Sequence, residues 1–417
     1  MPNQFLNTSW ISMEVLRNLK NAVKVAEYFN SDWEKDYEKT WAVGTTITVK
    51  FPQQFTIRQG LGYNPQGINR ISTTVSLNQP IGIDFQWDDY EAAVKAERSE
   101  EEIKEQYLAP AGVQIANEID SQAALFAKNN LSQIVGSLGT DPTSIVFMDQ
   151  ARARLLQKAG SYLSKKRAAL ISSSMQTNSI NTPVTSLFQP SDAITMAFKE
   201  GAMGKLKTFD VFEEQNLYTH TAGTWAGAVT ITGGGQSGTS LIITGTNNDT
   251  LKQGDKFSIA NVNFVNPRSR RIPGPPTPQT FTVTQDFTLT GGADTITILP
   301  AIYGPVGGQP SQYQNVDALP VNGAALTLWP GTANPNGAAG TVGLALSNQA
   351  FAIVGMRFYL PKAVEARSQA EDPQTGIPVR FVKAWDPVHS LQIHRFDTVF
   401  GFGNLYQDNA GVALLGA

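Results

Sequence analysis

The chain of 417 residues contains no cysteine. This absence excludes a disulfide framework, a thiolate zinc site, an iron–sulfur cluster and a cysteine nucleophile. Histidine is also scarce, since only His220, His389 and His394 are present, and their spacing does not suit a metal site. The sequence therefore predicts no cofactor and no metal ligands. A chain of this length can bury a substantial core without such staples.

Charge is low throughout the chain. Charged residues make up 16% of the sequence, and 32 Lys and Arg stand against 35 Asp and Glu for a net charge of −3. No surface-wide basic field is available, so any contact with nucleic acid must be local or weak. With 41% hydrophobic residues, this composition suits a surface covered by neighbouring subunits. It is equally compatible with a β-rich protein that has a neutral polar surface.

Long apolar runs are missing as well. No stretch approaches the roughly 18 residues of a spanning helix, and residues 1–10 lack the basic and apolar regions of a signal peptide. We therefore expect no contact with membranes and a protein made and used in the cytosol.

One long segment lacks glutamate. Residues 223–344 contain none, yet they hold 19 of the 36 glycines and 11 of the 23 prolines. Short segments of alternating apolar and polar residues recur there between turn signals, at residues 229–231, 241–244, 256–259, 281–284, 295–299 and 326–328. We predict an inserted β-barrel or sandwich domain.

The strongest helix signal lies before this segment. Ser99 and Glu102 form a capping box, and apolar residues then recur every four positions from Ile103 to Ile119. Pro110 predicts a kink or a fresh start near Ala109. If continuous over residues 99–131, the helix would be about 50 Å long, which is typical of a spine for an extended domain.

The remaining elements are mixed. Residues 12–40 predict either an arm that packs on another subunit or an ordinary first helix with a loop, and the apolar, turn-rich stretch from Gly44 to Phe85 predicts a long hairpin or loop in contact with a partner. Helices are expected at residues 149–163 and 192–199. Strands are expected at residues 45–49, 73–77, 168–171, 208–212, 344–361, 380–385 and 391–402, and a loop at 365–376. The fold class is therefore α+β.

No catalytic constellation emerges, so we expect no enzyme activity and no catalytic residues. The zinc-protease helix, the Walker loop, the dinucleotide fingerprint and the nucleophile elbow are all absent. Gly233 to Gly235 form a turn with no following lysine, and Glu100 to Glu102 form a solvated helix start. Asp141, Asp149 and Asp286 are scattered. Arg268, Arg270 and Arg271 beside residues 273–278 form a concentrated basic run, which we interpret as a solvent loop, as a contact loop to a neighbouring subunit or as a direct nucleic-acid contact.

The order of these parts resembles the major capsid (coat) proteins of tailed double-stranded DNA phages, in particular the short-tailed phage type with an inserted domain. The resemblance rests on the segments Val49-Lys-Phe-Pro-Gln-Gln-Phe55, Leu108-Ala-Pro-Ala-Gly-Val-Gln-Ile-Ala-Asn-Glu-Ile119, Lys128-Asn-Asn130, Val146-Phe-Met-Asp149, Leu251-Lys-Gln-Gly-Asp-Lys-Phe257 and Asn348-Gln-Ala-Phe-Ala-Ile353. It covers nearly the whole chain.

The resemblance implies the Hong Kong 97-like major capsid fold with an inserted all-β barrel. It divides the chain into an N-terminal arm (1–43), an E-loop hairpin (44–86), the spine helix with part of the peripheral domain (87–140), a first part of the axial domain (141–222), the inserted barrel (223–344) and the axial and peripheral return strands (345–417).

The same resemblance implies partners and a location. Copies of the chain would assemble as pentamers and hexamers into an icosahedral shell around double-stranded DNA, in the bacterial cytoplasm, and remain in the virion. The E-loop would lie over a neighbour, residues 201–212 would approach the capsomer centre, and residues 266–279 of the insert would touch adjacent capsomers. No long charged extension precedes the arm, so we expect a separate scaffolding protein, a portal protein and weak non-specific contact with DNA.

Two alternatives stay open at this point. A head-decoration or tail structural protein would also be β-rich and oligomeric but would lack the spine helix. A secreted carbohydrate-active enzyme is supported only by the Gly/Thr/Asn-rich insert.

Overall fold

A computed structural model describes most of the chain. The described residues are 8–32, 46–57, 60–61, 65–68, 71–77, 80–88, 104–159, 166–186, 204–206, 208–306, 311–329, 337–372, 375–389 and 391–417. They fall into two compact units. Unit 1 comprises residues 1–49, 72–123 and 351–404, and unit 2 comprises residues 50–71, 124–350 and 405–417. The α+β class is confirmed.

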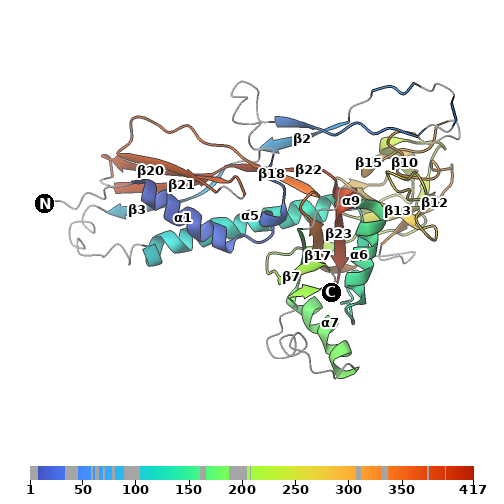
Figure 1. Cartoon of the computed structure of the whole chain (residues 1–417), viewed down its shortest axis with the longest axis horizontal. Coiled ribbons are helices and arrows are strands. Elements are labelled where there is room, and N and C mark those ends of the chain that lie inside the picture. The colour runs from blue at the N-terminus through green and yellow to red at the C-terminus, as the bar shows by residue number, and fades with distance from the viewer. Residues whose placement is uncertain are drawn as a thin grey trace. The chain divides into compact units, whose positions relative to one another are not determined.

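Unit 1 combines helices with two four-stranded sheets (Figure 1). The sheets have the strand orders β1-β2-β22-β18 and β19-β20-β21-β3. The elements are α1 (Thr8–Ala22), η1 (Ala26–Tyr28), β1 (Thr46–Lys50), β2 (Ser72–Leu77), β3 (Ile81–Asp88), the π-helix η2 (Lys104–Leu108), the start of α5 (Ala109–Asn130), β18 (Phe351–Gly355), β19 (Ala366–Glu371), β20 (Pro378–Asp386), β21 (Leu391–Thr398) and β22 (Phe400–Asn404).

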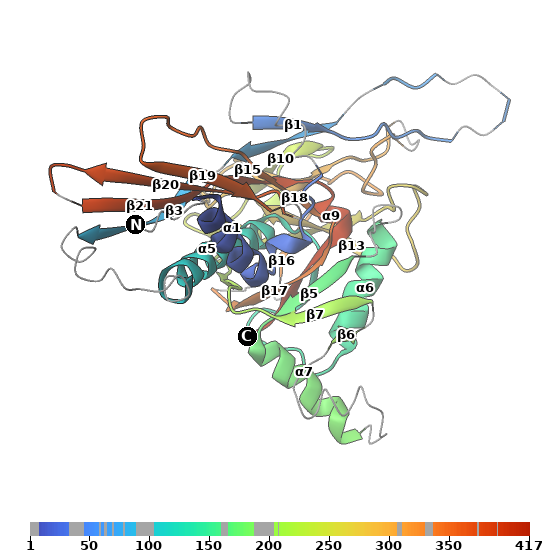
Figure 2. The ribbon, with the colours of Figure 1, turned by 60° about the vertical axis from the view of Figure 1, so that its left-hand side comes forward.

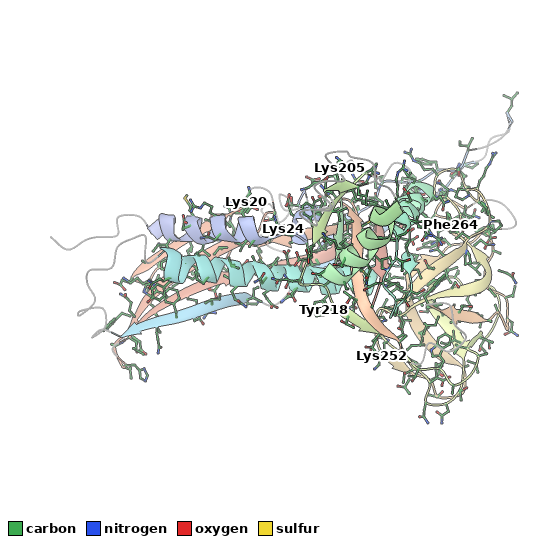
Figure 3. All side chains as sticks on the ribbon, turned by 90° about the horizontal axis from the view of Figure 1, so that it is seen from below. Lys20, Lys24, Lys205, Tyr218, Lys252 and Phe264 are labelled. Carbon is green, nitrogen blue, oxygen red and sulfur yellow. The ribbon has the colours of Figure 1, made fainter. Side chains whose placement is uncertain are left out.

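Helices α1 and α5 lie side by side (Figure 3). They approach closely at Gly112, where an added Cβ would lie 2.8 Å from the Val15 carbonyl oxygen. One turn beyond α1, the buried Asp120 carboxylate of α5 accepts hydrogen bonds from the backbone N–H groups of Lys24 and Ala26, at 2.6 and 3.0 Å. These bonds satisfy donors at the start of η1 that have no intrahelical partner. The N-terminal helix is thereby fastened to α5.

Unit 2 contains a seven-stranded sheet with the order β4-β23-β17-β5-β7-β6, to which β8 adds by pairing with β17. The β4–β23 and β5–β7 pairs are parallel, and the others are antiparallel. The elements of unit 2 outside residues 223–338 are β4 (Ile134–Gly136), α6 (Val146–Ala159), β5 (Arg167–Ile171), α7 (Ser173–Ser186), β6 (Lys205–Leu206), β7 (Phe209–Glu213), β8 (Thr219–Thr221), β17 (Ala339–Ser347), α9 (Gln407–Ala410) and β23 (Gly411–Leu415).

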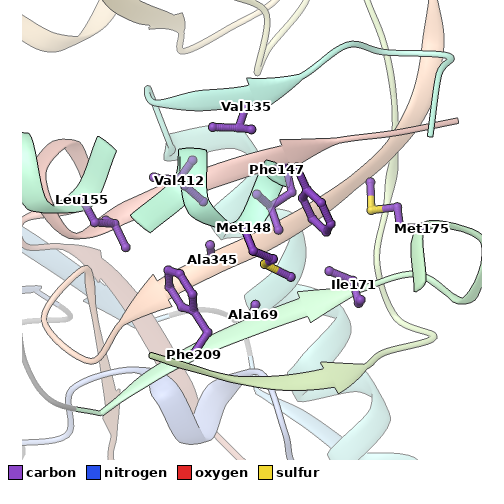
Figure 4. Close-up of a cluster of buried hydrophobic side chains, with 12 residues drawn as sticks. Val135, Phe147, Met148, Leu155, Ala169, Ile171, Met175, Phe209, Ala345 and Val412 are labelled. Carbon is purple, nitrogen blue, oxygen red and sulfur yellow. The ribbon is translucent and has the colours of Figure 1, made fainter. Parts of the chain in front are cut away.

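The core of this sheet lies under α6 (Figures 2 and 4). Met148 and Leu155 of α6 are almost completely buried against Phe209 of β7 and Val412 of β23. Fully burying a side chain of this size contributes about 1.5–3 kcal/mol. Packing of one helix face on the sheet therefore contributes to the stability of unit 2.

All six strands predicted inside the glutamate-free segment are confirmed, and they form one sheet with the order β16-β12-β13-β15-β10-β9. The sheet closes because Thr230 bridges to Ala325, and the N–H groups of Ile231 and Leu326 donate to the carbonyls of Ala324 and Val229 at 2.9 Å. The result is a six-stranded β-barrel. Its strands are β9 (Thr230–Ile231), β10 (Gly238–Thr244), β12 (Lys256–Asn263), β13 (Pro278–Val283), β15 (Asp294–Ile302) and β16 (Leu326–Leu328), with β11 (Thr250–Leu251) and β14 (Phe287–Thr288) as a separate pair.

Near Ala109, where a kink or a fresh start was expected, the helix type changes, since the π-helix η2 runs directly into α5 and Pro110 occupies the first turn of α5. Proline lacks the N–H that a continuous α-helix would use at this position, and the turn before it is a π-helix and not a regular α-helix. The capping box at Ser99 and the predicted helix at residues 192–199 lie outside the described residues. Helix α6 begins at Val146, three residues before its predicted start, and residues 160–163 of that prediction also lie outside.

Two sequence expectations require correction, and one helix was missed. The strand expected at residues 344–361 is wrong over residues 348–350, which form the turn between β17 and β18, and over residues 356–361. The loop expected at residues 365–376 is wrong over Ala366–Glu371, where β19 pairs with β20 in continuous register. This strand has no β-branched residues, so cross-strand hydrogen bonding rather than local propensity decides its structure. Helix α7 was not predicted, because its Ser/Thr/Asn-rich sequence has weak propensity and little apolar pattern. Its one local signal is Ser172, whose Oγ accepts a hydrogen bond from the Met175 N–H.

Candidate assembly surfaces and the barrel junction

The segment of residues 51–71 is held against the barrel by amide side chains. Gln53 Nε2 donates to Gln312 Oε1 at 3.3 Å, and Gln312 Nε2 donates to the Gly67 carbonyl at 2.8 Å. Within the segment, Gln66 exchanges hydrogen bonds with the backbone N–H and C=O of Thr56, at 2.8 and 2.5 Å. Neutral amide contacts therefore fix this segment to its own chain.

The same segment presents apolar side chains to solvent. Phe55 is 63% exposed, Ile57 94%, Leu61 98% and Ile68 74%. Single exposed apolar residues are ordinary on a protein surface, but several on one segment mark a contact surface. Phe55, Ile57 and Leu61 are among the residues from which the sequence predicted partner contact for this region.

The arginines of the predicted basic run have different surroundings in the structure. Arg270 donates to Gln54 Oε1 at 2.9 Å, to the Gln314 carbonyl at 3.2 Å and to the Gln312 carbonyl. Its guanidinium thus joins the barrel to residues 51–71 of the same chain. Arg268 and Arg271 are exposed, so a contact with a neighbour stays a prediction for these two.

A cavity of about 180 Å³ lies within unit 2, beside these contacts of Arg270. Aromatic and proline side chains make up much of its lining, which includes Phe51, Pro267, Tyr303, Tyr313 and Tyr406. The Phe51 and Tyr406 rings lie 5.1 Å apart, centroid to centroid. Asp408 also lines this cavity.

Of residues 201–212, expected near a capsomer centre, positions 204–206 and 208–212 are described. Lys205 in β6 is exposed, and its Nζ lies 3.9 Å from Asp210 Oδ1 of β7 (Figure 3). At that distance an exposed ion pair contributes little stability. The position of this hairpin in a capsomer stays a prediction.

The chain enters and leaves the barrel through neighbouring strands. β8 ends at Thr221, β17 begins at Ala339, and the Ala222 N–H donates to the Ala338 carbonyl at 2.9 Å. Buried Asp255 organises this junction. Its carboxylate contacts His220 Nε2 at 2.8 Å and accepts hydrogen bonds from the N–H groups of Gly223 and Lys252, at 3.1 and 2.7 Å.

Next to Asp255, the buried Lys256 side chain reaches the end of α5. Its Nζ donates to the carbonyls of Lys128 and Leu131 at 3.1 and 2.5 Å. These carbonyls lie at a helix C-terminus, where intrahelical donors run out and a cation is favoured. Burial, assisted by the nearby Lys128, lowers the pKa of Lys256 to about 7, although Asp255 opposes the shift. No local pattern in the sequence predicts this contact, because 125 positions separate Lys256 and Leu131.

The three histidines serve separate contacts. His220 contacts Asp255, and His389 contacts Asp386 at 2.7 Å. His394 stacks on Phe85 with a centroid separation of 5.0 Å, and burial lowers the pKa of His394 to about 4. Over the described ranges, no group of three His, Asp or Glu side chains is placed to hold a metal ion.

The other candidate residues do not assemble into a site. Asp141 accepts hydrogen bonds from Asn178 and the Ala417 N–H, Asp286 pairs with Lys252, and Asp149 lies in the first turn of α6. The turn of Gly233 to Gly235 is described, whereas Glu100 to Glu102 lie outside the described residues. No helix in the described part of the chain is both long and apolar enough to cross a membrane.

Comparison with known proteins gives one family. The model of the family described as P22 coat protein, gene protein 5, matches residues 40–416. No match was found among curated proteins.

Among solved structures, the chain is similar to three from phages. For Mycobacterium phage Che8 the identity is 12%, with 94% of this chain and 90% of that chain covered and a TM-score of 0.48. For the capsid of Cyanophage P-SCSP1u the identity is 10%, with 95% of this chain and 88% of that chain covered and a TM-score of 0.44. For the capsid of Ralstonia phage GP4 the identity is 5%, with 89% of this chain and 83% of that chain covered and a TM-score of 0.43.

Proposed function

The chain belongs to the P22 coat protein family and is a major capsid protein of a tailed phage, and we propose that its copies join as pentamers and hexamers into an icosahedral head shell around double-stranded DNA. Its place is the virion. Assembly occurs in the cytoplasm of the bacterial host. The role is geometric and not enzymatic, which the family favours over the decoration-protein and carbohydrate-enzyme alternatives.

The observation that carries this proposal is the two-sided character of residues 51–71. One side is fastened to the barrel through Gln53 and Gln54, while Ile57 and Leu61 are more than nine-tenths exposed. Burying apolar surface stabilises association by about 25 cal/mol per Å². A copy of the same chain is the neighbour that a coat protein always meets, so we assign this surface to contact between subunits.

The division of the chain into arm, E-loop, spine, axial domain, inserted barrel and return strands is part of the proposal. Entry and exit of the barrel on the adjacent strands β8 and β17 support its assignment as an insertion. The predicted boundary at residue 344 lies inside β17, so we set the end of the insert at Ala338, before that strand begins.

The partners proposed are a separate scaffolding protein, a portal protein and the packaged DNA. A net charge of −3 supports only weak, non-specific DNA contact. Weak attraction suits an inner surface past which DNA must move during packaging and release.

Substitution of Ile57 or Leu61 by aspartate tests the assembly surface. Each variant is co-expressed with the scaffolding protein of the same phage, and the yield of closed shells is measured by sedimentation and negative-stain electron microscopy. We expect shell yield to fall at least tenfold, because a carboxylate at a desolvated contact costs about 1.4 kcal/mol or more, and 1.4 kcal/mol is tenfold in an equilibrium constant. The circular dichroism spectrum and unfolding midpoint of the subunit should not change.

Ile57→Leu serves as the conservative control and should assemble normally. Val321→Asp, at a barrel position that is 58% exposed, controls for adding a charge to an exposed apolar site. Wild-type shell yield from Ile57→Asp and Leu61→Asp would show that this surface is not a subunit contact.

A further inference from the structure

Lys158, in the last turn of α6, lies in a buried polar cluster that the assembly function does not use. Its Nζ is 2.9 Å from Gln279 Oε1 of β13 and 3.2 Å from Asp408 Oδ1 of α9. Gln279 Nε2 lies 3.3 Å from the same Asp408 oxygen. Amine, primary amide and carboxylate thus contact one another in a triangle, with 4% of the Lys158 side chain, 1% of Gln279 and 14% of the Asp408 side chain exposed.

Burial disfavours a charged amine at Lys158, whereas a neighbouring aromatic ring favours one. The Phe264 ring (Figure 3) lies 5.3 Å from Lys158 Nζ, centroid to atom. Burial lowers the pKa of Lys158, against the opposing attraction of Asp408, and the nearby Arg154 lowers it further. The hydroxyl of Ser132 donates to Asp408 Oδ1 at 2.5 Å and fixes the carboxylate between the other two groups.

We propose that Lys158 and Gln279 react to form an intramolecular amide bond, with Asp408 as the catalytic residue that carries the proton. A desolvated lysine is a nucleophile, and an adjacent carboxylate in hydrogen-bond reach can move its proton. The three groups come from α6, the barrel and α9, so the reaction requires the folded subunit and no added reagent.

The reaction balances within these three side chains. The Lys158 ammonium gives one proton to the Asp408 carboxylate, and the neutral Nζ attacks the Gln279 Cδ. The Nζ–Cδ bond forms, the Cδ–Nε2 bond breaks, and the protons of the attacking nitrogen and of Asp408 pass to the departing Nε2. The products are a secondary amide and one ammonium ion, with Asp408 again a carboxylate.

The neighbouring buried lysine offers a contrast. Among the described residues, the hydrogen bonds of Lys256 Nζ go to the backbone carbonyls of Lys128, Leu131 and Gly254, and a peptide carbonyl has no amine that can leave without cutting the chain. Lys158 meets a side-chain amide, whose amine can leave as ammonia. The bond would join positions 121 residues apart, and closing so long a loop strongly restricts the unfolded chain.

Intact-mass measurement of the denatured full-length wild type tests the proposal directly. We expect a mass lower than that of the sequence by one ammonia, and a branched proteolytic peptide that joins the fragments holding Lys158 and Gln279. Lys158→Arg and Asp408→Asn should each restore the mass expected from their sequences. Lys256→Arg, the matched buried-lysine control, should keep the deficit of one ammonia.

The readout does not depend on whether a variant folds, since the wild-type mass alone decides the first question. A wild-type mass equal to that of the sequence, both in fresh subunits and in assembled shells, would reduce the cluster to a hydrogen-bonded ion pair and overturn the proposal. A deficit of one water with a branch between Lys158 and Asp408 would also overturn it, because the acyl donor would then be the carboxyl group.

Discussion

At the scale of single residues, two buried lysines connect the barrel to the rest of unit 2. Lys158 reaches from α6 to Gln279 in the barrel, and Lys256 reaches from the barrel to the carbonyl end of α5. Both lie where an isolated charge would be costly and where polar partners offset that cost. Their partners are distant in sequence, which is why the sequence identified neither.

The pH dependence of stability tests the role of Lys256. The unfolded chain keeps the Lys256 proton up to a pKa of 10.5, whereas the folded chain loses it near 7. The cost of burying the charge is therefore complete below pH 7 and disappears as the pH rises to 10.5. We expect the unfolding free energy of the wild type to rise relative to that of Lys256→Met over this window, by up to about 1.4 kcal/mol per pH unit.

Urea unfolding at several pH values between 7 and 10 measures this difference. Lys252→Met is the matched control, because Lys252 lies in the same turn with about half of its side chain exposed, and it should track the wild type. A constant gap between wild type and Lys256→Met across the window would contradict the assigned titration.

At the scale of elements, the N-terminal helix depends on a close approach at Gly112. A Cβ at this position would lie 2.8 Å from the Val15 carbonyl oxygen and 2.9 Å from the Asn18 Cβ, closer than ordinary contacts. Glycine disfavours a helix by about 1 kcal/mol, so its presence in α5 is explained by the packing of α1.

Gly112→Leu should separate the two helices. We expect the subunit to lose about 1–3 kcal/mol through overpacking, despite the higher helix propensity of leucine. Urea unfolding measures the loss, and limited proteolysis should show earlier cleavage within residues 8–22. Val113→Leu, at a position that is 43% exposed, should leave both unchanged. A Gly112→Leu protein as stable as the Val113→Leu control would mean that α1 does not pack on α5 in solution.

The same scale shows what sequence patterns can and cannot predict. Alternating residues such as those of 295–299 identified every strand of the barrel, because one face of each strand must be buried. No local sequence pattern predicts that the barrel closes through Thr230 and Ala325, since this pairing joins chain positions far apart. Strand β19 and helix α7 were missed because pairing and packing override weak propensity there.

The candidate contact surface was predictable only in part. Exposed apolar residues such as Ile57 and Leu61 stood out in the sequence as too apolar for a solvated loop. The hydrogen bonds of Gln53, Gln54 and Arg270 could not be predicted, because glutamine and arginine side chains carry no positional signal and their partners lie more than 200 positions away.

At the scale of the whole molecule, membership of the P22 coat protein family means that function resides in contacts between copies. Each contact can be weak, because a subunit in a closed shell meets several neighbours and later contacts form at high effective concentration. A low-charge surface with an exposed apolar segment suits many such contacts better than one strong interface.

Electron microscopy of the wild-type chain co-expressed with its scaffolding protein tests the central claim most directly. We expect closed shells of uniform size in the fast-sedimenting fraction, with pentamers at the vertices and hexamers between them. A soluble monomer or small ring under every assembly condition would contradict the proposal that this chain builds the head shell.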